Sequence, residues 1–239
     1  MLSIKNLTTK ANKKTILKNI TATFQKGKIY AVMGVNGSGK STLVKTIMGD
    51  PLFTISQNSE IKLNEKSIKN IETNERAEQG IFASIQSPPE ISGVTIKQLL
   101  RAVTKNKSIP AKELLKKISL YAEELKIPEE LLDRSLNEGF SGGERKKMEL
   151  LQMAILDPEY IFLDEIDTGV DVDAIKTIST FLKNFIRNTE KTLVIITHQN
   201  KIFKELKPDH VLVLKDGEII KEGDFKLIEK IEKEGFDKI

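Results

Sequence analysis

A short segment near the start of the chain has the residue types and spacing that bind phosphate. It reads Gly34-Val35-Asn36-Gly37-Ser38-Gly39-Lys40-Ser41 and fills every defined position of the pattern G-x-x-x-x-G-K-[ST]. Its glycines let successive backbone N–H groups point at phosphate oxygens, and Lys40 adds a positive charge for the β- and γ-phosphates. Ser41 supplies the hydroxyl that usually ligates Mg²⁺. The alternative is a plain glycine turn, but the complete pattern predicts a nucleotide site.

The residues around this segment fit the strand, loop and helix that such a site needs. A β-prone run over residues 29–33 comes before it, and a helix-compatible run over residues 41–48 follows until Gly49 and Pro51 end it. A helix that begins at the loop adds the positive end of its dipole to the anion site. We therefore expect the phosphate groups at the N-terminus of this helix.

A second segment could supply the acidic groups that nucleotide hydrolysis requires. Residues 160–163 are apolar or aromatic and read as a buried strand, which ends in Asp164 and Glu165. Beside a phosphate-loop strand, Asp164 would hold Mg²⁺ through water, and Glu165 would orient or deprotonate the attacking water. The alternative is a solvent-exposed strand end that happens to carry two acids.

A third segment, Phe140-Ser141-Gly142-Gly143-Glu144, combines a helix start with exposed backbone N–H groups. Ser141 and Glu144 have the spacing of a capping box, so a helix is expected over residues 145–156 until Asp157 and Pro158 end it. Gly142 and Gly143 leave N–H groups open at the positive end of that helix, which indicates a second anion site.

The pattern of apolar residues predicts an α/β protein. Residues 2–9 and 16–24 read as an antiparallel hairpin that a strand over residues 61–64 joins. Short apolar runs at residues 29–33, 81–85, 160–164, 193–197 and 211–214 read as buried parallel strands. Residues 87–158 look like a helical insertion with no strand, in which apolar residues recur at helical spacing over 111–126. Residues 225–239 look like an amphipathic helix. The predicted divisions are 1–86, 87–158 and 159–239, the first and last forming the core.

Composition narrows the class of protein further. The 239 residues include 39% hydrophobic and 30% charged residues, with no apolar run long enough for a membrane helix and no secretory signal, so we expect a cytoplasmic protein. The 38 basic residues are interspersed with 34 acidic ones, which gives little support for nucleic-acid binding. Cysteine is absent and histidine occurs twice, which excludes disulfides, thiolate-held clusters and multi-histidine metal sites on this chain.

Together, and in this order, the motifs resemble those of ATP-binding cassette (ABC) ATPases over essentially the whole chain. Besides the phosphate loop and the acidic strand, the chain has four further family motifs. These are a glutamine loop at Gln86, a signature segment at residues 140–144, a D-loop at residues 168–171 and a switch histidine, His198. The resemblance implies a P-loop NTPase core with an N-terminal antiparallel β subdomain and an inserted α-helical subdomain.

The same resemblance assigns roles to residues. It implies a Mg²⁺-dependent ATPase that forms an ATP-dependent head-to-tail dimer. Each ATP in this dimer lies between the phosphate loop of one subunit and the signature segment of the other. The implied ATP-binding residues are Gly34, Val35, Asn36, Gly37, Ser38, Gly39, Lys40, Ser41, Thr42, Ser141, Gly142, Gly143 and Asp171. The implied catalytic residues are Glu165, His198, Gln86 and Lys40, and the implied Mg²⁺ ligands are Ser41, Gln86 and Asp164. The chain departs from the family at the adenine site, since no aromatic residue precedes Phe24.

The narrower resemblance is to the SufC family of the SUF iron-sulfur cluster assembly system. It rests on residues 86–94 after the glutamine loop, on residues 137–147 with Phe140 and Glu144 in the signature, and on residues 163–174. It implies SufB-like and SufD-like scaffold partners that dock between Gln86 and Val94, and no contact with nucleic acid or insertion into a membrane. Two other interpretations stay open: the nucleotide-binding subunit of an ABC membrane transporter, and a nucleotide-dependent switch with negligible turnover.

Overall fold

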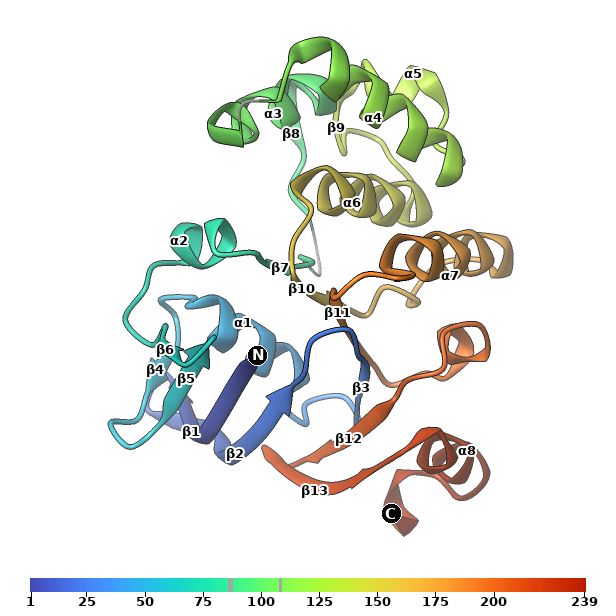
Figure 1. Cartoon of the computed structure of the whole chain (residues 1–239). Coiled ribbons are helices and arrows are strands. Elements are labelled where there is room, and N and C mark those ends of the chain that lie inside the picture. The colour runs from blue at the N-terminus through green and yellow to red at the C-terminus, as the bar shows by residue number, and fades with distance from the viewer. Residues whose placement is uncertain (86–87, 108) are drawn as a thin grey trace. The chain divides into compact units, whose positions relative to one another are not determined.

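A computed structural model describes residues 1–85, 88–107 and 109–239 of the chain (Figure 1). Its contacts divide it into two compact units. The first unit comprises residues 1–84, 158–168 and 188–239, and the second comprises residues 85–157 and 169–187. The chain therefore passes from the first unit to the second between Ser84 and Ile85.

The first unit begins with an antiparallel sheet whose strand order is β2-β1-β5-β6, with β4 also paired to β1. The β1–β2 pair is a long hairpin with register shifts in its middle. Alternate residues of both strands are buried, as expected for a sheet with one face on the core. The strands are β1 (Leu2–Ala11), β2 (Lys14–Phe24), β4 (Thr54–Ile55), β5 (Glu60–Leu63) and β6 (Lys66–Ser67).

The second sheet of the first unit has the order β13-β12-β3-β11-β10-β7 and is parallel except for the edge strand β13. Strands β10 and β11 are buried along their whole length, which matches their continuous apolar sequences. The strands are β3 (Ile29–Met33), β7 (Ile81–Ala83), β10 (Tyr160–Asp164), β11 (Thr192–Thr197), β12 (His210–Lys215) and β13 (Glu218–Gly223).

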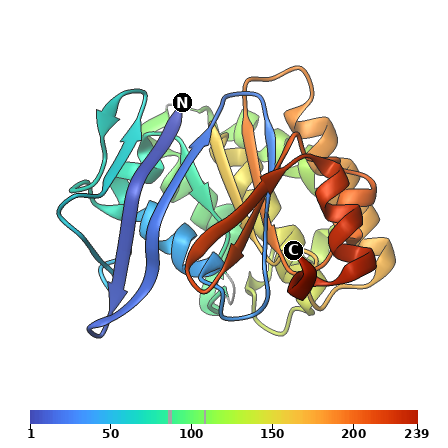
Figure 2. The ribbon, with the colours of Figure 1, turned by 90° about the horizontal axis from the view of Figure 1, so that it is seen from below.

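One hydrophobic core joins the two sheets of the first unit to α1. Phe24 at the end of β2 makes edge-to-face contacts with Tyr30 of β3 (centroids 5.1 Å apart) and Phe162 of β10 (5.5 Å). Figure 2 shows the C-terminal hairpin β12–β13 beside α8, which packs on β12. The helices of this unit are α1 (Lys40–Met48), α2 (Thr73–Glu78), α8 (Phe225–Glu234) and the 3₁₀ turns η2 (Lys201–Lys204) and η3 (Phe236–Lys238).

The second unit is mainly helical. Capping boxes start α3, at Thr95 and Gln98, and α6, at Ser141 and Glu144. Helix α6 ends at Asp157, which takes a left-handed conformation with φ of 51°. The elements are β8 (Ile91–Thr95), α3 (Ile96–Val103), η1 (Lys105–Lys107), α4 (Ala111–Glu124), α5 (Glu129–Leu132), β9 (Ser135–Leu136), α6 (Gly142–Leu156) and α7 (Val172–Ile186).

The predicted α/β class is confirmed, as are the N-terminal hairpin and the five parallel strands. The prediction of no strand within residues 87–158 is wrong, because β8 pairs with the two-residue β9 across an irregular register. The predicted C-terminal helix is divided at Gly235, whose φ of 78° ends α8. Residues 169–187, predicted to belong to the C-terminal core, group with the helical unit by their contacts.

Candidate functional site

The phosphate-loop segment connects β3 to α1 and has glycine where no other residue fits the backbone. A Cβ on Gly34 would lie 2.2 Å from the carbonyl oxygen of Leu214 in β12, closer than any contact between such atoms. Gly39, the residue before α1, has a φ of 106°, a backbone conformation that residues other than glycine rarely adopt. These two glycines therefore fix the loop tightly against β12 and turn it into the helix.

Lys40 is buried inside the curl of this loop, with 5% of its surface exposed. Its Nζ donates hydrogen bonds to the carbonyl oxygens of Gly34 (2.8 Å) and Val35 (2.9 Å). Burial lowers the pKa of Lys40, and the charges of Glu165 and Asp164 act in the opposite direction. A buried ammonium held by two carbonyl groups is well placed to exchange one of them for a phosphate oxygen.

Asp164 ends β10 next to the first turn of α1. Burial raises the pKa of its carboxyl group, while a hydrogen bond from Ser41 lowers it. Among the described residues, Oδ1 of Asp164 has no hydrogen-bond partner. A buried carboxylate oxygen beside a hydroxyl is a donor set that Mg²⁺ accepts, because this ion takes one or two protein oxygens and completes its octahedron with water and phosphate. The described residues contain no cluster of three acidic, histidine or cysteine side chains that could hold a metal alone.

Glu165 and His198 lie together at the ends of two neighbouring parallel strands. Oε1 of Glu165 is 3.2 Å from Nδ1 of His198. The backbone of Glu165 is left-handed, with a φ of 52°, and its N–H donates to the carbonyl oxygen of Ile196 at 2.8 Å. A left-handed glutamate costs conformational energy, which the contact to β11 offsets, and the turn sets its carboxylate beside the histidine.

Sequence reasoning missed two side chains that shape this site. Oγ of Ser84, just after β7, accepts a hydrogen bond from the backbone N–H of Asp164 at 2.7 Å. Buried Asp167 accepts from Oγ1 of Thr197 at 2.8 Å, and that oxygen accepts from the N–H of Gln199 at 2.9 Å, which holds the turn around His198. Both side chains are polar residues near the carboxyl ends of parallel strands, and that position was the available signal.

The signature segment and Asp171 lie in the second unit. Oγ of Ser141 accepts from the N–H of Glu144 (3.3 Å), whose Oε2 accepts from the N–H of Ser141 (2.7 Å). The bond to this N–H lowers the pKa of Glu144. A Cβ on Gly142 would lie 3.4 Å from the carbonyl oxygen of Gly169, so the α6 N-terminus is close to the D-loop. Oδ1 of Asp171 caps α7 by accepting from the N–H of Ala174 at 2.7 Å.

Within the first unit, the structure brings together the side chains of five predicted residues. They are Lys40, Ser41, Asp164, Glu165 and His198. The loop residues Val35, Asn36 and Gly37 are exposed, while Ser38 and Gly39 are buried. The second unit holds Ser141, Gly142, Gly143 and Asp171. Gln86 lies outside the described residues, so its predicted roles as catalytic residue and metal ligand stay predictions.

Relatives of the chain are found along its whole length. Residues 17–168 match the family model described as "ABC transporter". The "Probable ATP-dependent transporter SufC" of Escherichia coli (strain K12) is 39% identical, with 99% of this chain and 97% of that relative aligned. A "Probable ATP-dependent transporter" of Synechocystis sp. (strain ATCC 27184 / PCC 6803 / Kazusa) is 41% identical, with 99% of this chain and 94% of that relative aligned.

Solved structures give the same fold. The dimeric structure of a bacterial ABC transporter cassette aligns with a TM-score of 0.81 at 22% identity, over 94% of this chain and 99% of that one. A nucleotide-free ATP-binding cassette from an ABC transporter aligns with a TM-score of 0.79 at 25% identity, over 98% of this chain and 95% of that one. In the described ranges, no helix has the length and apolar content that a membrane crossing needs. The family model and the full-length relatives show that the chain belongs to the ABC transporter family and is an ABC ATPase domain similar to SufC.

Proposed function

We propose that this protein is an ATP-hydrolysing, SufC-like ABC ATPase that drives conformational change in a SufB- and SufD-type scaffold during iron-sulfur cluster assembly in the cytoplasm. The observation that supports hydrolysis best is the pairing of Glu165 with His198, at 3.2 Å, in the unit that also holds Lys40 and Asp164. The 39% identity to the Escherichia coli relative named SufC supports the assignment to the assembly system.

The phosphate loop binds the nucleotide in this proposal. Backbone N–H groups of the loop and the α1 N-terminus receive the phosphate oxygens, and Lys40 neutralises the β- and γ-phosphates. Ser41 and Asp164 would hold Mg²⁺, which, when bound, spreads the charge of the β- and γ-phosphate oxygens. Ser84 keeps the backbone of Asp164 in place through the bond to its N–H.

Glu165 acts on the attacking water. Its carboxylate accepts a proton from, or orients, a water in line with the γ-phosphate. His198 donates from Nδ1 to Oε1 of Glu165, and Nε2 would donate to the γ-phosphate with the ring in its imidazolium form. The left-handed turn at Glu165 keeps its carboxylate at this position, and Asp167 and Thr197 hold the turn at His198.

A complete site in this proposal needs two copies of the chain. Gly142 and Gly143 present their N–H groups, and Ser141 its hydroxyl group, at the start of α6, where the capping box has fixed the backbone. In a head-to-tail dimer these groups would meet the γ-phosphate bound to the loop of the partner subunit. Asp171 would carry the state of one site to the other, from its position at the start of α7.

The partner would dock on the segment between Gln86 and Val94. Of its described part, Pro89, Glu90, Ser92 and Gly93 are exposed, as is the neighbouring Ile85 at 57%. The second candidate is the nucleotide-binding subunit of a membrane transporter, which the names of the full-length relatives favour. Its coupling surface would occupy the same segment.

Two measurements test the proposal. Glu165→Gln should lower the ATPase rate by about 100-fold or more and leave ATP binding intact, because it removes the base and not the phosphate contacts. Tagged purification from native cells without detergent should recover SufB-like or SufD-like proteins that raise turnover. Recovery only with an integral membrane protein, after solubilisation, would favour the transporter instead. A Glu165→Gln protein with the wild-type rate would contradict the assignment of the base.

A further inference from the structure

The second unit contains a buried carboxyl group that the proposed mechanism does not use. Glu149 lies in the middle of α6 with 7% of its surface exposed, between the buried residues Met148 and Leu150. A carboxylate in such a place normally has a charged or hydrogen-bonding partner, since burying it alone is costly. The charge of Lys146, one turn earlier on the same helix, favours its ionised form.

The partner of Glu149 is a backbone group at the point where the chain enters the second unit. Oε1 of Glu149 accepts a hydrogen bond from the N–H of Ile85 at 2.5 Å. Strand β7 ends at Ala83, so the N–H of Ile85 lies beyond the ladder that pairs β7 with β10. The carboxyl group of Glu149 therefore takes the place of a strand partner for this N–H.

The residues that follow are bonded to the same region of the second unit. Nδ2 of Asn137 donates to the carbonyl oxygen of Pro89 at 2.9 Å, and Nη2 of Arg145 contacts Oε1 of Glu90 at 3.2 Å. Arg145 also donates through Nε to the carbonyl oxygen of Phe140 at 3.0 Å, one residue before the signature serine. Strand β8 pairs with β9 a few residues further along.

These contacts join two features that the proposed function needs. The docking segment, residues 86–94, of which 88–94 are described, carries the proposed partner surface, and Ile85 leads into it. Helix α6 carries the signature glycines at its N-terminus. Of the two α6 side chains with described bonds to this region, Arg145 and Glu149, Glu149 is the buried one, and it holds Ile85, the residue that leads into the segment. Buried Asn137, which precedes the helix, holds Pro89. A buried, charge-assisted hydrogen bond resists opening more than the exposed pair of Arg145 and Glu90 does.

We propose that Glu149 is a positioning residue that fixes the start of the docking segment to the signature helix, so that movement of a bound partner reaches Ser141, Gly142 and Gly143. The proposal rests on the proposed function for its partner. Glu149 acts through Ile85 and does not contact the nucleotide, so ATP affinity and the basal ATPase rate do not depend on Glu149.

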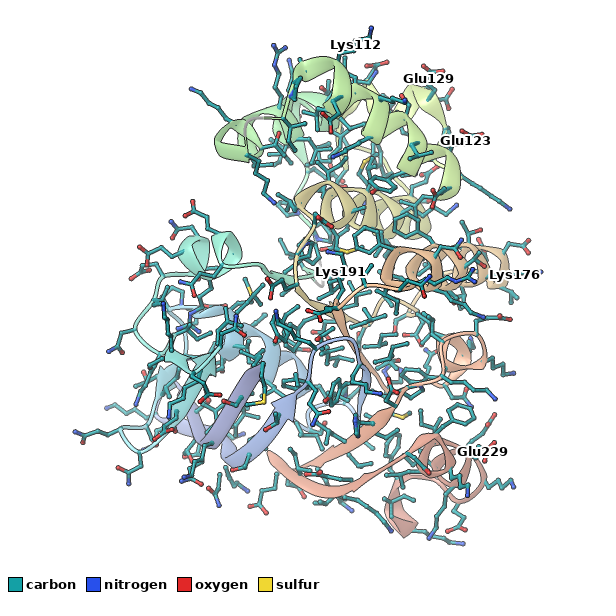
Figure 3. All side chains as sticks on the ribbon, in the orientation of Figure 1. Lys112, Glu123, Glu129, Lys176, Lys191 and Glu229 are labelled. Carbon is teal, nitrogen blue, oxygen red and sulfur yellow. The ribbon has the colours of Figure 1, made fainter. Side chains whose placement is uncertain are left out.

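Three variants of Glu149 separate positioning from simple structural support. Glu149→Leu has a similar volume and no acceptor, and Glu149→Asp keeps the charge but withdraws the oxygen by one methylene group. Glu149→Gln keeps an acceptor oxygen at the same distance and should rescue the contact. The matched control is Glu123→Gln, a change of the same chemistry at an exposed position on α4 (Figure 3).

Hydrogen exchange of the full chain is measured first. The Leu and Asp variants should speed exchange at the Ile85 amide and over residues 90–94 by about 10-fold or more, while the Gln variant and the control stay within about 3-fold of wild type. Equal exchange rates in the wild type and in the Leu and Asp variants would contradict the claim that Glu149 holds the Ile85 amide. The Asp variant keeps this test available if the Leu variant does not fold.

ATPase rates with and without the scaffold proteins are measured next. We expect the Leu and Asp variants to lose about 10-fold of the stimulated rate, to keep the basal rate and KM for ATP within about 2-fold, and the Gln variant to be stimulated as wild type is. If a variant with faster exchange at Ile85 is still fully stimulated by the scaffold, the proposal that Glu149 transmits partner movement to the signature segment is wrong. If the scaffold does not stimulate the wild type, the proposed function fails, and exchange at Ile85 still decides the role of Glu149.

Discussion

Replacing Glu149 by glutamine should make the stability of this protein depend less on pH. Burial raises the pKa of Glu149 from 4.5 to about 7, and the bond from the Ile85 N–H and the charge of Lys146 limit the rise. Between these two values the folded chain holds a proton that the unfolded chain has lost. The free energy of unfolding therefore falls as the pH rises through this window. At about 1.4 kcal/mol for each unit of pKa, the full effect is about 3 kcal/mol.

Urea unfolding of the wild type and the Glu149→Gln variant at about pH 5 and about pH 8 measures this effect. Relative to the wild type, the variant should gain about 2.5 kcal/mol between the two pH values, because most of the window lies between them. Comparing the pH values cancels the constant cost of burying an amide. The exposed Glu123→Gln control should gain nothing. An equal stability difference at both pH values, or a titration of Glu149 by carboxyl NMR near 4.5, would refute the reasoning.

Three further changes test the scaffold and the site. Arg76, 1% exposed, donates to four backbone carbonyl groups, two of them in the last turn of α1, so Arg76→Met should lower the free energy of unfolding by about 3–5 kcal/mol in urea titrations; a loss below about 1 kcal/mol would contradict this. Gly34→Ala should weaken ATP binding by about 10-fold or more in calorimetry, because its Cβ would collide with the Leu214 carbonyl oxygen; unchanged affinity would show that the loop tolerates the displacement. Ser84→Ala removes the acceptor for the Asp164 N–H and should raise the Mg²⁺ concentration for half-maximal ATPase by about 3-fold or more, with Ser84→Thr restoring it; equal Mg²⁺ dependence in all three proteins would remove Ser84 from the site.

The parts of the site that the sequence predicted are those that backbone geometry dictates locally. The loop needs glycine at Gly34 because of a close approach and at Gly39 because of a left-handed φ, so the pattern itself carries the structure. Ser141 and Glu144 form the capping box that their spacing predicted. Asp164 and Glu165 follow a continuous apolar run that could only be a buried strand, and the observed β10 ends at the predicted residue.

The parts that escaped prediction depend on partners distant in the sequence. Arg76 lies in a polar run that reads as a solvated helix, yet carbonyl groups of residues up to 30 positions away draw it inside. Strand β8 contains Gly93, whose φ is 78°, and finds its short partner β9 about 40 residues later, so neither strand shows a local pattern. Ser84 gave no signal beyond its position near a strand end, because its function depends on the N–H of Asp164.

Two of the buried charged side chains, Arg76 and Glu149, are compensated in different ways, and the difference bears on function. Arg76 donates to four carbonyl oxygens, which satisfy most of its five N–H groups and suit a permanent structural role. Glu149 has one N–H bond and a nearby lysine, which leaves its pKa at about 7 and makes its ionised form costly at neutral pH. By the same reasoning, glutamine at this position would give a more stable fold. Folding stability therefore does not account for the charge at this position, and fixing Ile85 to the signature helix requires only an acceptor oxygen, which glutamine would also supply.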